Sequence, residues 1–383
     1  MEEKEIKDFE FRIINLNTKI DVPEFGETSR YDWINYGPTN QFPQFLVDTY
    51  HMKSITHKTI INRKQKMVFG EGWIEGQSLQ FKEFFNNKYS DDNLNQVLRK
   101  ISFDLELHGG FALNIIWSKL GDRIAAVEHI DFESVRVDKM NGKTDGPDYY
   151  WISGDWSNTR KNKPKKYQGF SRKWKENKSQ ILYITEYQPG SRMFYPIPMY
   201  YSSINWILAE WEISNFHRAS IQNGFNGGFL LNFATGVPPK DEIKRAYKEI
   251  EDKYTGSYNA GKFILTFSNG KESEPRMTPI PLQDTDARYT QLNDLIKQNI
   301  FTANEVTNPE LFGVSVPGKL GGKQEMLEGL EIFQSTYINY RQKFIEDTFN
   351  KLASINNVPE KMEIRKYELD LGKIEGENLL PEN

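Results

Sequence analysis

The stretch from Tyr201 to Gln222 is the feature that most restricts how this chain can fold. It has the periodicity of a helix, yet apolar side chains lie on more than one of its faces. A helix that is apolar on several faces is either buried in a core or packed against other chains. Trp206 and Trp211 are roughly 140° apart around the helix at ~3.6 residues per turn, so we do not expect one chain's core to cover both. The pattern predicts a subunit interface that includes Trp206, Trp211 and Phe216.

Helices and strands are mixed along the rest of the chain, which predicts an α+β protein. The apolar periodicity predicts helices at 44–68, 92–107, 286–301 and 323–352, and another that opens at Pro238. Strands are expected at 111–117, 124–130, 134–137, 181–184, 229–233 and 262–267. The strands from 111 to 137 suggest a small meander with polar turns. The 383 residues exceed the usual size of one domain, so we expect more than one lobe.

Composition excludes several classes of protein. Lys and Arg number 49 against 53 Asp and Glu, a net charge of -4, whereas proteins that hold DNA by neutralising its phosphates are basic. Cysteine is absent, which excludes disulfides, thiol nucleophiles and Cys-ligated metals and fits a reducing compartment. No run approaches the ~20 apolar residues of a membrane span. The first five residues are mostly charged, so we expect no secretory signal.

One segment imitates a phosphate-binding loop. Residues 313–319 have the G-x-x-x-x-G-K spacing, but Leu320 stands where a Ser or Thr hydroxyl should bind Mg²⁺. A buried strand should precede such a loop, and Pro309 interrupts the segment before it. We interpret 313–322 as a mobile glycine loop that exposes Lys319 and Lys323. A nucleotide-dependent DNA enzyme built on this loop remains the alternative.

Candidate catalytic and metal-binding groups are sparse. None of the five histidines shows i, i+4 metal-ligand spacing to a second histidine with a neighbouring carboxylate. His108 is the best catalytic candidate by position, although a histidine in a helix-ending turn is the simpler interpretation. Asp284 and Asp286 favour a helix N-terminus over a cation site. The sequence therefore predicts no catalytic residue, no metal and no cofactor.

A basic run extends from Arg160 to Lys178. It includes Lys165, Lys166, Arg172 and Lys173, interleaved with aromatic residues. Cations interleaved with aromatic rings can bind nucleic acid. A solvated surface excursion between strands explains the run equally well, so both interpretations stay open.

Four segments occur in one order along the chain, from about Tyr36 to Leu352. The first is Tyr36-Gly37-Pro38-x-Asn40-x-Phe42-Pro43, with a helix that ends in Phe69-Gly70-Glu71-Gly72, and the second is the turn His108-Gly109-Gly110-Phe111-Ala112 with Ile130-Asp131-x-x-x-Val135-Arg136-Val137. The third is a helix reaching Ile221, followed by Asn223-Gly224-Phe225 and the strand from Phe229. The fourth comprises Ile300 to Phe312, the glycine loop and the long helix. In this order the chain resembles the portal proteins of tailed double-stranded DNA bacteriophages, in the compact class of this length.

This resemblance implies a fold in named parts. Residues 1–200 are expected to form an α/β wing, 201–223 and 284–304 the two helices of a stem, and 224–283 a small α/β clip between them. Residues 305–322 would be a glycine-rich tunnel loop and 323–354 a long wing helix. Residues 355–383 would be a short tail or a minimal crown.

The resemblance also implies a function and its partners. The chain is expected to be a non-enzymatic subunit of a homo-oligomeric ring of twelve, through which DNA enters and leaves a capsid. Gly318, Lys319, Gly321 and Lys323 would contact double-stranded DNA in the channel. The partners would be the terminase large subunit, which carries the ATPase, the major capsid protein and a head–tail adaptor. No membrane is implied: the ring would assemble in the host cytoplasm and reside at one vertex of the virion.

Charge agrees with the resemblance, because a conduit that must release DNA is better mildly acidic than basic. Another ring-forming head–tail adaptor is the second alternative. Such adaptors are usually smaller and lack a helix–clip–helix insertion.

Overall fold

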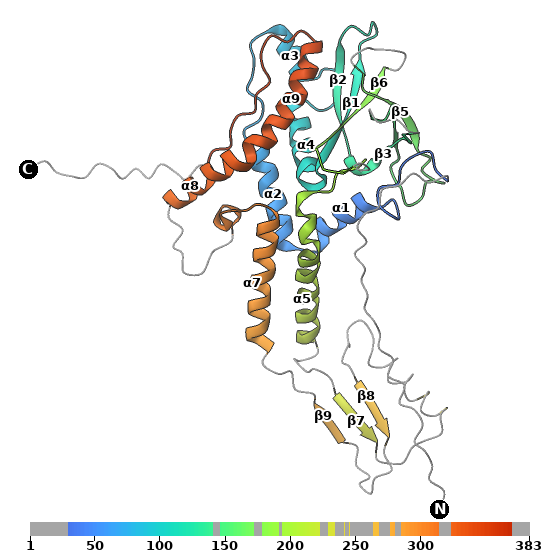
Figure 1. Ribbon diagram of the computed structural model, residues 1–383, viewed down its shortest axis with the longest axis vertical. Coiled ribbons are helices and arrows are strands. Elements are labelled where there is room, and N and C mark those ends of the chain that lie inside the picture. Colours follow the sequence, from blue (N-terminus) through green and yellow to red (C-terminus); the bar gives the residue numbers. More distant parts are fainter. Residues whose placement is uncertain are drawn as a thin grey trace, which may run out of the picture.

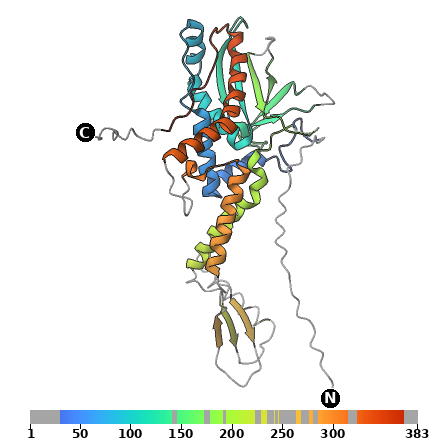
Figure 2. The ribbon, with the colours of Figure 1, turned by 60° about the vertical axis from the view of Figure 1, so that its left-hand side comes forward.

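The chain forms a body from which a long helical hairpin projects (Figure 1). The computed structural model describes residues 30–140, 146–171, 178–190, 194–222, 229–233, 263–267, 276–279, 285–313 and 323–369, with positions 241 and 245. A small sheet lies at the far end of the hairpin (Figures 1 and 2). Within the described residues, no helix combines the length and apolarity needed to cross a membrane.

The body begins with helices at its N-terminal side. They are α1 (Phe42–Met52), α2 (Ile55–Phe69), α3 (Leu79–Asn86) and α4 (Leu94–His108). The single helix predicted at 44–68 is wrong, because Ser54 starts a new helix: its backbone is extended and its hydroxyl accepts a 2.9 Å hydrogen bond from the His57 N–H. Helix α3 was not predicted. Its cap, Ser78, accepts from the Phe81 N–H at 3.0 Å.

A six-stranded mixed sheet forms the rest of the body. Its strands are β1 (Gly110–Trp117), β2 (Ile124–Ile130), β3 (Val135–Val137), β4 (Tyr149–Ile152), β5 (Lys165–Gly169) and β6 (Ser179–Thr185). Their order is β2-β1-β6-β5-β4-β3, with β5 and β6 parallel. The predicted meander is therefore wrong beyond β1 and β2: β6 returns to pair with β1 and separates it from β3. Strand β1 is largely buried, which suits a strand with neighbours on both edges.

The hairpin leaves the body after β6. Its first helix follows a single 3₁₀ turn, η2 (Met199–Ser203), and the two helices are α5 (Ile204–Gln222) and α7 (Thr285–Ala303). The sheet between them consists of β7 (Phe229–Phe233), β8 (Phe263–Phe267) and β9 (Arg276–Pro279). Strand β7 is parallel to β8 and antiparallel to β9. The helix predicted from Pro238 lies almost entirely outside the described residues.

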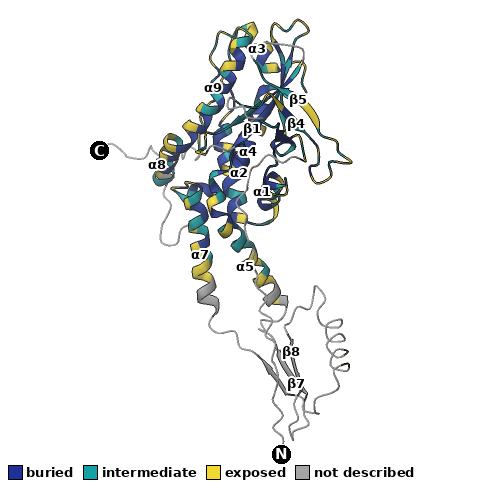
Figure 3. Ribbon diagram, turned by 45° about the vertical axis from the view of Figure 1, so that its right-hand side comes forward, coloured by how far each residue is buried: buried dark blue, intermediate teal, exposed yellow. Residues whose placement is uncertain are grey.

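A long helical run then covers the body. After the short turn η3 (Pro309–Phe312) it comprises α8 (Lys323–Phe333), a π-helical segment η4 (Gln334–Ile338) and α9 (Asn339–Ile355). The prediction of one long helix is confirmed, with a π segment that the sequence did not reveal. Burial is concentrated in the body, while exposure increases along α5 and α7 away from it (Figure 3).

Candidate functional site: the helical hairpin and its root

The root of α5 is fixed by the corner between α1 and α2. Glu210 on α5 accepts hydrogen bonds from the hydroxyls of Ser54 and Thr56, the latter at 2.8 Å. Ser54 and Thr56 lie at the N-terminus of α2, where a carboxylate is favoured by the helix dipole. Next to it, the ammonium of Lys53 lies 3.4 Å from the ring centroid of Trp211. Two consecutive residues of α5 are thus held by one corner of the body.

The three residues predicted at a subunit interface occupy different environments within the single chain. Trp206 is half-buried and packs against the main core, and Trp211 is half-buried beneath Lys53. Phe216, further from the body, is 37% exposed. The two indoles are therefore partly covered by the chain itself, and Phe216 is the most exposed of the three.

Apolar side chains on the hairpin divide into a buried and an exposed set. Near the body Ile207, Ile296 and Ile300 are fully buried. Further out, among the side chains that the structure describes, four large apolar ones are exposed, two on each helix: Phe216 and Ile221 on α5, Leu292 and Leu295 on α7. Covering exposed apolar surface lowers the free energy of the protein. The outer half of the hairpin is therefore a candidate surface for contact with another chain.

A buried charged cluster lies within the body. Glu106 of α4 is 1% exposed and lies between two cations, with Lys64 Nζ 3.9 Å and Arg341 Nε 3.5 Å from its carboxylate oxygens. The Tyr337 hydroxyl in the π segment donates to Glu106 at 2.5 Å. Arg341 also reaches Glu186, just after β6, at 2.5 Å. The cluster joins α2, α4, the end of β6 and the long helix.

Burial shifts the pKa of two members of this cluster. It lowers the pKa of Lys64 to about 8, because the charged form loses water, although Glu106 opposes the shift. Burial likewise raises the pKa of Glu186, and the nearby Arg341 opposes that shift. Breaking one partner of such a cluster would leave an uncompensated buried charge. We assign the cluster a structural role, because it joins the long helix to the body.

Two segments that carry the family resemblance meet at a buried arginine. Arg136 on β3 is 1% exposed, and its Nε donates to the Asn40 side chain at 2.6 Å. Its Nη2 donates to the Asn40 carbonyl at 2.8 Å, and its Nη1 to the carbonyls of Glu133 and Val135. The Asn40 and Arg136 segments are therefore one structural unit, although the sequence did not indicate why they occur together.

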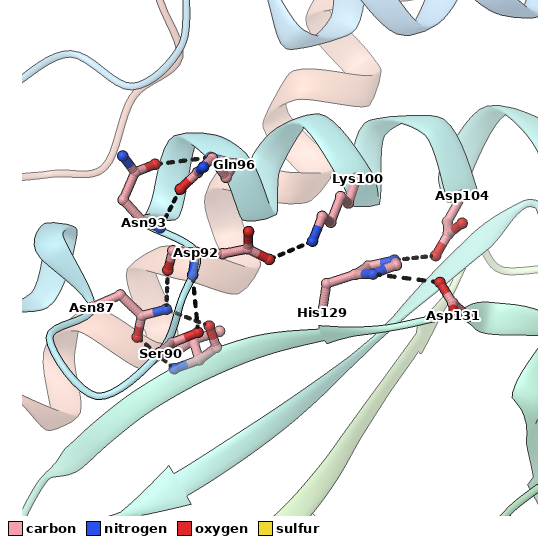
Figure 4. A network of polar contacts seen from close by, with 10 residues as sticks. Asn87, Ser90, Asp92, Asn93, Gln96, Lys100, Asp104, His129 and Asp131 are labelled. Atoms are coloured by element: carbon pink, nitrogen blue, oxygen red, sulfur yellow. Dashed lines mark hydrogen bonds and ion pairs between the residues drawn. The ribbon is translucent and has the colours of Figure 1, made fainter. Parts of the chain in front are cut away.

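His108 and His129 make contacts that stabilise the body. His108 ends α4, stacks on Phe132 with 5.3 Å between ring centroids, and is buried, which lowers its pKa to about 3. His129 on β2 points at Asp104 on α4, with 2.7 Å between Nε2 and Oδ2 (Figure 4). In the described part of the chain, no group of three or more His, Asp or Glu residues could hold a metal ion.

The remaining predicted sites are only partly described. Lys165 and Lys166 are exposed on β5, whereas Arg172 and Lys173 lie outside the described residues. Gly318, Lys319 and Gly321 also lie outside them, and of Lys323 only its place at the start of α8 is described. Of the G-x-x-x-x-G-K spacing, Gly313 alone is described, in a left-handed conformation with φ 78° after η3.

The architecture defines a class of fold: a mixed α/β body, a projecting helical hairpin that ends in a small sheet, and a long helix across the body. No family model and no curated protein sequence matches the chain, so its likeness to known proteins rests on structure alone.

Solved structures share this fold over most of their length. One is a chain from the neck of an empty gene transfer agent (GTA) particle, 12% identical, with a TM-score of 0.56 over 87% of this chain and 85% of that one. Another comes from the neck of a native GTA particle computed with C12 symmetry, 13% identical, with a TM-score of 0.54 over 86% and 85%. A third is an HK97 family phage portal protein from Corynebacterium diphtheriae, 9% identical, with a TM-score of 0.50 over 83% and 95%. The chain therefore has a fold similar to that of a phage portal protein.

Proposed function

We propose that this chain is the subunit of a portal ring in a tailed phage or a GTA-like particle. The observation that carries the proposal is the extent of the structural likeness. It covers 83–87% of the chain and 84–95% of each similar structure, so the hairpin and the long helix are compared along with the body. One of these structures belongs to a neck computed with C12 symmetry, which supports a ring of twelve.

In this proposal each part of the fold has a role in a channel for DNA. The body up to residue 200 is the wing, α5 and α7 are the stem, and the sheet of β7, β8 and β9 belongs to the clip. Residues 305–322 are the tunnel loop, whose Gly318, Lys319 and Gly321, with Lys323, contact DNA in the channel. The clip docks the terminase large subunit and later a head–tail adaptor, and the wing meets the major capsid protein. The chain itself is not an enzyme.

The ring closes through the stem. The exposed apolar residues occur on both helices, so one subunit can present α5 to the α7 of the next, a head-to-tail contact that closes by rotation. These side chains are 37–63% exposed, so covering the exposed part of one of them contributes roughly 0.5–2 kcal/mol, and a closed ring repeats the contact at every interface. Trp206, Trp211 and Phe216 are the α5 residues we assign to this interface.

The mass of the particle in solution tests the proposal. Light scattering of the purified chain should give about twelve times the subunit mass of 44.8 kDa, or another single ring size, without added ligand. A species of 44.8 kDa that persists at high protein concentration would exclude the ring.

A further inference from the structure

Residues 146–171, which contain β4 and β5, form a positively charged surface that the proposed function does not explain. We call this segment the basic hairpin. It carries five cations, Arg160, Lys161, Lys163, Lys165 and Lys166, against two acids, Asp148 and Asp155. The whole chain has a net charge of -4, so this concentration of positive charge is local. A fold does not require such a concentration, and a ligand of opposite charge would explain it.

One of the five cations is already neutralised within the chain. Lys166 Nζ lies 3.0 Å from Asp138 Oδ2 and 4.5 Å from the ring centroid of Tyr149. The other four are exposed and form no ion pair among the described residues: Arg160, Lys161, Lys163 and Lys165. Four positive charges therefore face solvent within six residues of sequence.

The backbone that presents these charges is held in place by buried and polar contacts. Trp156 is buried, its ring lies 5.1 Å from that of Trp33, and its Nε1 donates to the Ser134 carbonyl at 2.9 Å. Asp155 Oδ1 accepts from the backbone and the hydroxyl of Ser157 at 2.8 and 2.6 Å. A ligand would thus meet cations on an ordered loop, which lowers the cost of binding.

The residue types distinguish between two kinds of anionic partner. Protein–protein interfaces have apolar and aromatic centres and are depleted in lysine. In the basic hairpin three of the four solvent-facing cations are lysines, and Tyr149, at 39%, is the one large apolar side chain among the described residues 146–171 that is exposed. Lysine and arginine without an apolar anchor suit the phosphate backbone of a nucleic acid, which is bound by charge alone.

We propose that the basic hairpin binds the phosphate backbone of double-stranded DNA, at a surface separate from the channel. β4 and β5 lie on one side of the body, and α8, which follows the tunnel loop, lies on the other; the three views agree (Figures 1, 2 and 3). In the proposed ring, with the tunnel loops toward the axis, the basic hairpin lies on the outer circumference. DNA bound there is outside the ring, where a filled particle holds its genome.

The salt dependence of DNA binding tests this inference. Each phosphate contact contributes about 0.9 to the slope of log affinity against log salt. With a mixed-sequence duplex as probe, Lys163→Gln/Lys165→Gln should therefore lower that slope by about 1.8 per site and weaken binding at least tenfold in low salt. Lys82→Gln/Lys88→Gln changes the net charge equally at two exposed lysines elsewhere, and should leave slope and affinity unchanged.

Three results would overturn the inference. One is an equal loss of DNA affinity in Lys163→Gln/Lys165→Gln and in Lys82→Gln/Lys88→Gln. Another is a salt slope that stays unchanged in Lys163→Gln/Lys165→Gln. The third is selective binding of polyglutamate over the duplex, which would indicate an acidic protein partner. Lys163→Arg/Lys165→Arg keeps the charge and should bind as wild type, which separates lost charge from misfolding. Light scattering on each sample reports assembly independently, so failure of the ring and failure of DNA binding are told apart.

Discussion

The hydroxyl of Thr56, in the first turn of α2, donates a 2.8 Å hydrogen bond to the carboxylate of Glu210 on α5. With the bond from Ser54 it ties the hairpin to the body at the point where the hairpin begins. Because α5 is 19 residues long, a small rotation of the helix near Glu210 displaces its far end by a large distance. The contact therefore determines where the outer hairpin lies relative to the body.

Removal of Glu210 should loosen this root. Glu210→Ala leaves the Ser54 and Thr56 hydroxyls without their acceptor and removes a negative charge from the N-terminus of α2, which together cost about 1–3 kcal/mol. We expect a lower midpoint in urea unfolding and fewer closed rings. Glu212→Ala, an exposed position on the same helix, is the control and should behave as wild type. Equal behaviour of the two variants would contradict the role of the contact.

The exposed apolar residues of the hairpin should act on assembly more than on folding. Phe216→Ser/Leu295→Ser replaces one exposed side chain on each helix and should lower the unfolding free energy of the subunit by about 1–2 kcal/mol, because each side chain is also partly covered within the chain. Because both lie at the proposed interface, light scattering should show the loss of the ring. Leu120→Ser, at an 83% exposed position between β1 and β2, should assemble normally. Rings from the double variant would refute the interface.

Acid should destabilise the fold through two buried histidines. Burial lowers the pKa of both His57 and His108 from 6.5 to about 3. Between those values the unfolded state binds a proton that the folded state excludes, so stability falls as the pH drops below 6.5. At pH 5 each of these two histidines should account for up to ~2 kcal/mol of lost stability.

Urea unfolding at pH 7 and pH 5 measures this effect. His108→Phe keeps the stacking on Phe132 and should reduce the loss between the two pH values by up to ~2 kcal/mol. If the variant loses as much stability as wild type over this interval, His108 is not held neutral in the folded protein.

Lys64 should produce a second rise of stability with pH, in alkali rather than in acid. Its pKa is about 8 in the fold and 10.5 ordinarily, so between these values the unfolded state binds more protons. Stability therefore rises as the pH increases from 8 to 10.5, whereas below pH 8 the buried charge imposes a constant cost of order 3 kcal/mol. The difference in unfolding free energy between wild type and Lys64→Met should grow in favour of wild type from pH 8 to 10. A constant difference would show that Lys64 keeps its ordinary pKa.

Long periodic elements could be predicted from the sequence, and their junctions could not. Helix α4 and the run from α8 to α9 follow from apolar periodicity sustained over many residues. The break between α1 and α2 depends on a single serine hydroxyl, and β9 has four residues, too few for a pattern. The parallel pairing of β5 with β6 depends on where the nine residues between them bring the chain back, which no local pattern encodes.

The same reasoning explains what was missed at the site. The residues of the charged cluster come from positions as distant as Lys64 and Arg341, and each resembles an ordinary surface charge in the sequence. Phe216 was predicted at a subunit interface because it lies on a second apolar face of its helix; it is 37% exposed in the single chain, and its place at an interface stays a prediction.

The central claim, that this chain builds a portal ring, is tested most directly by electron microscopy of the purified full-length protein. The account predicts closed rings of a single symmetry, twelve-fold by likeness to the C12 neck, with paired α5 and α7 hairpins around a central channel and the basic hairpin at the outer edge. A field of isolated 44.8 kDa subunits, or of open filaments without a channel, would contradict it.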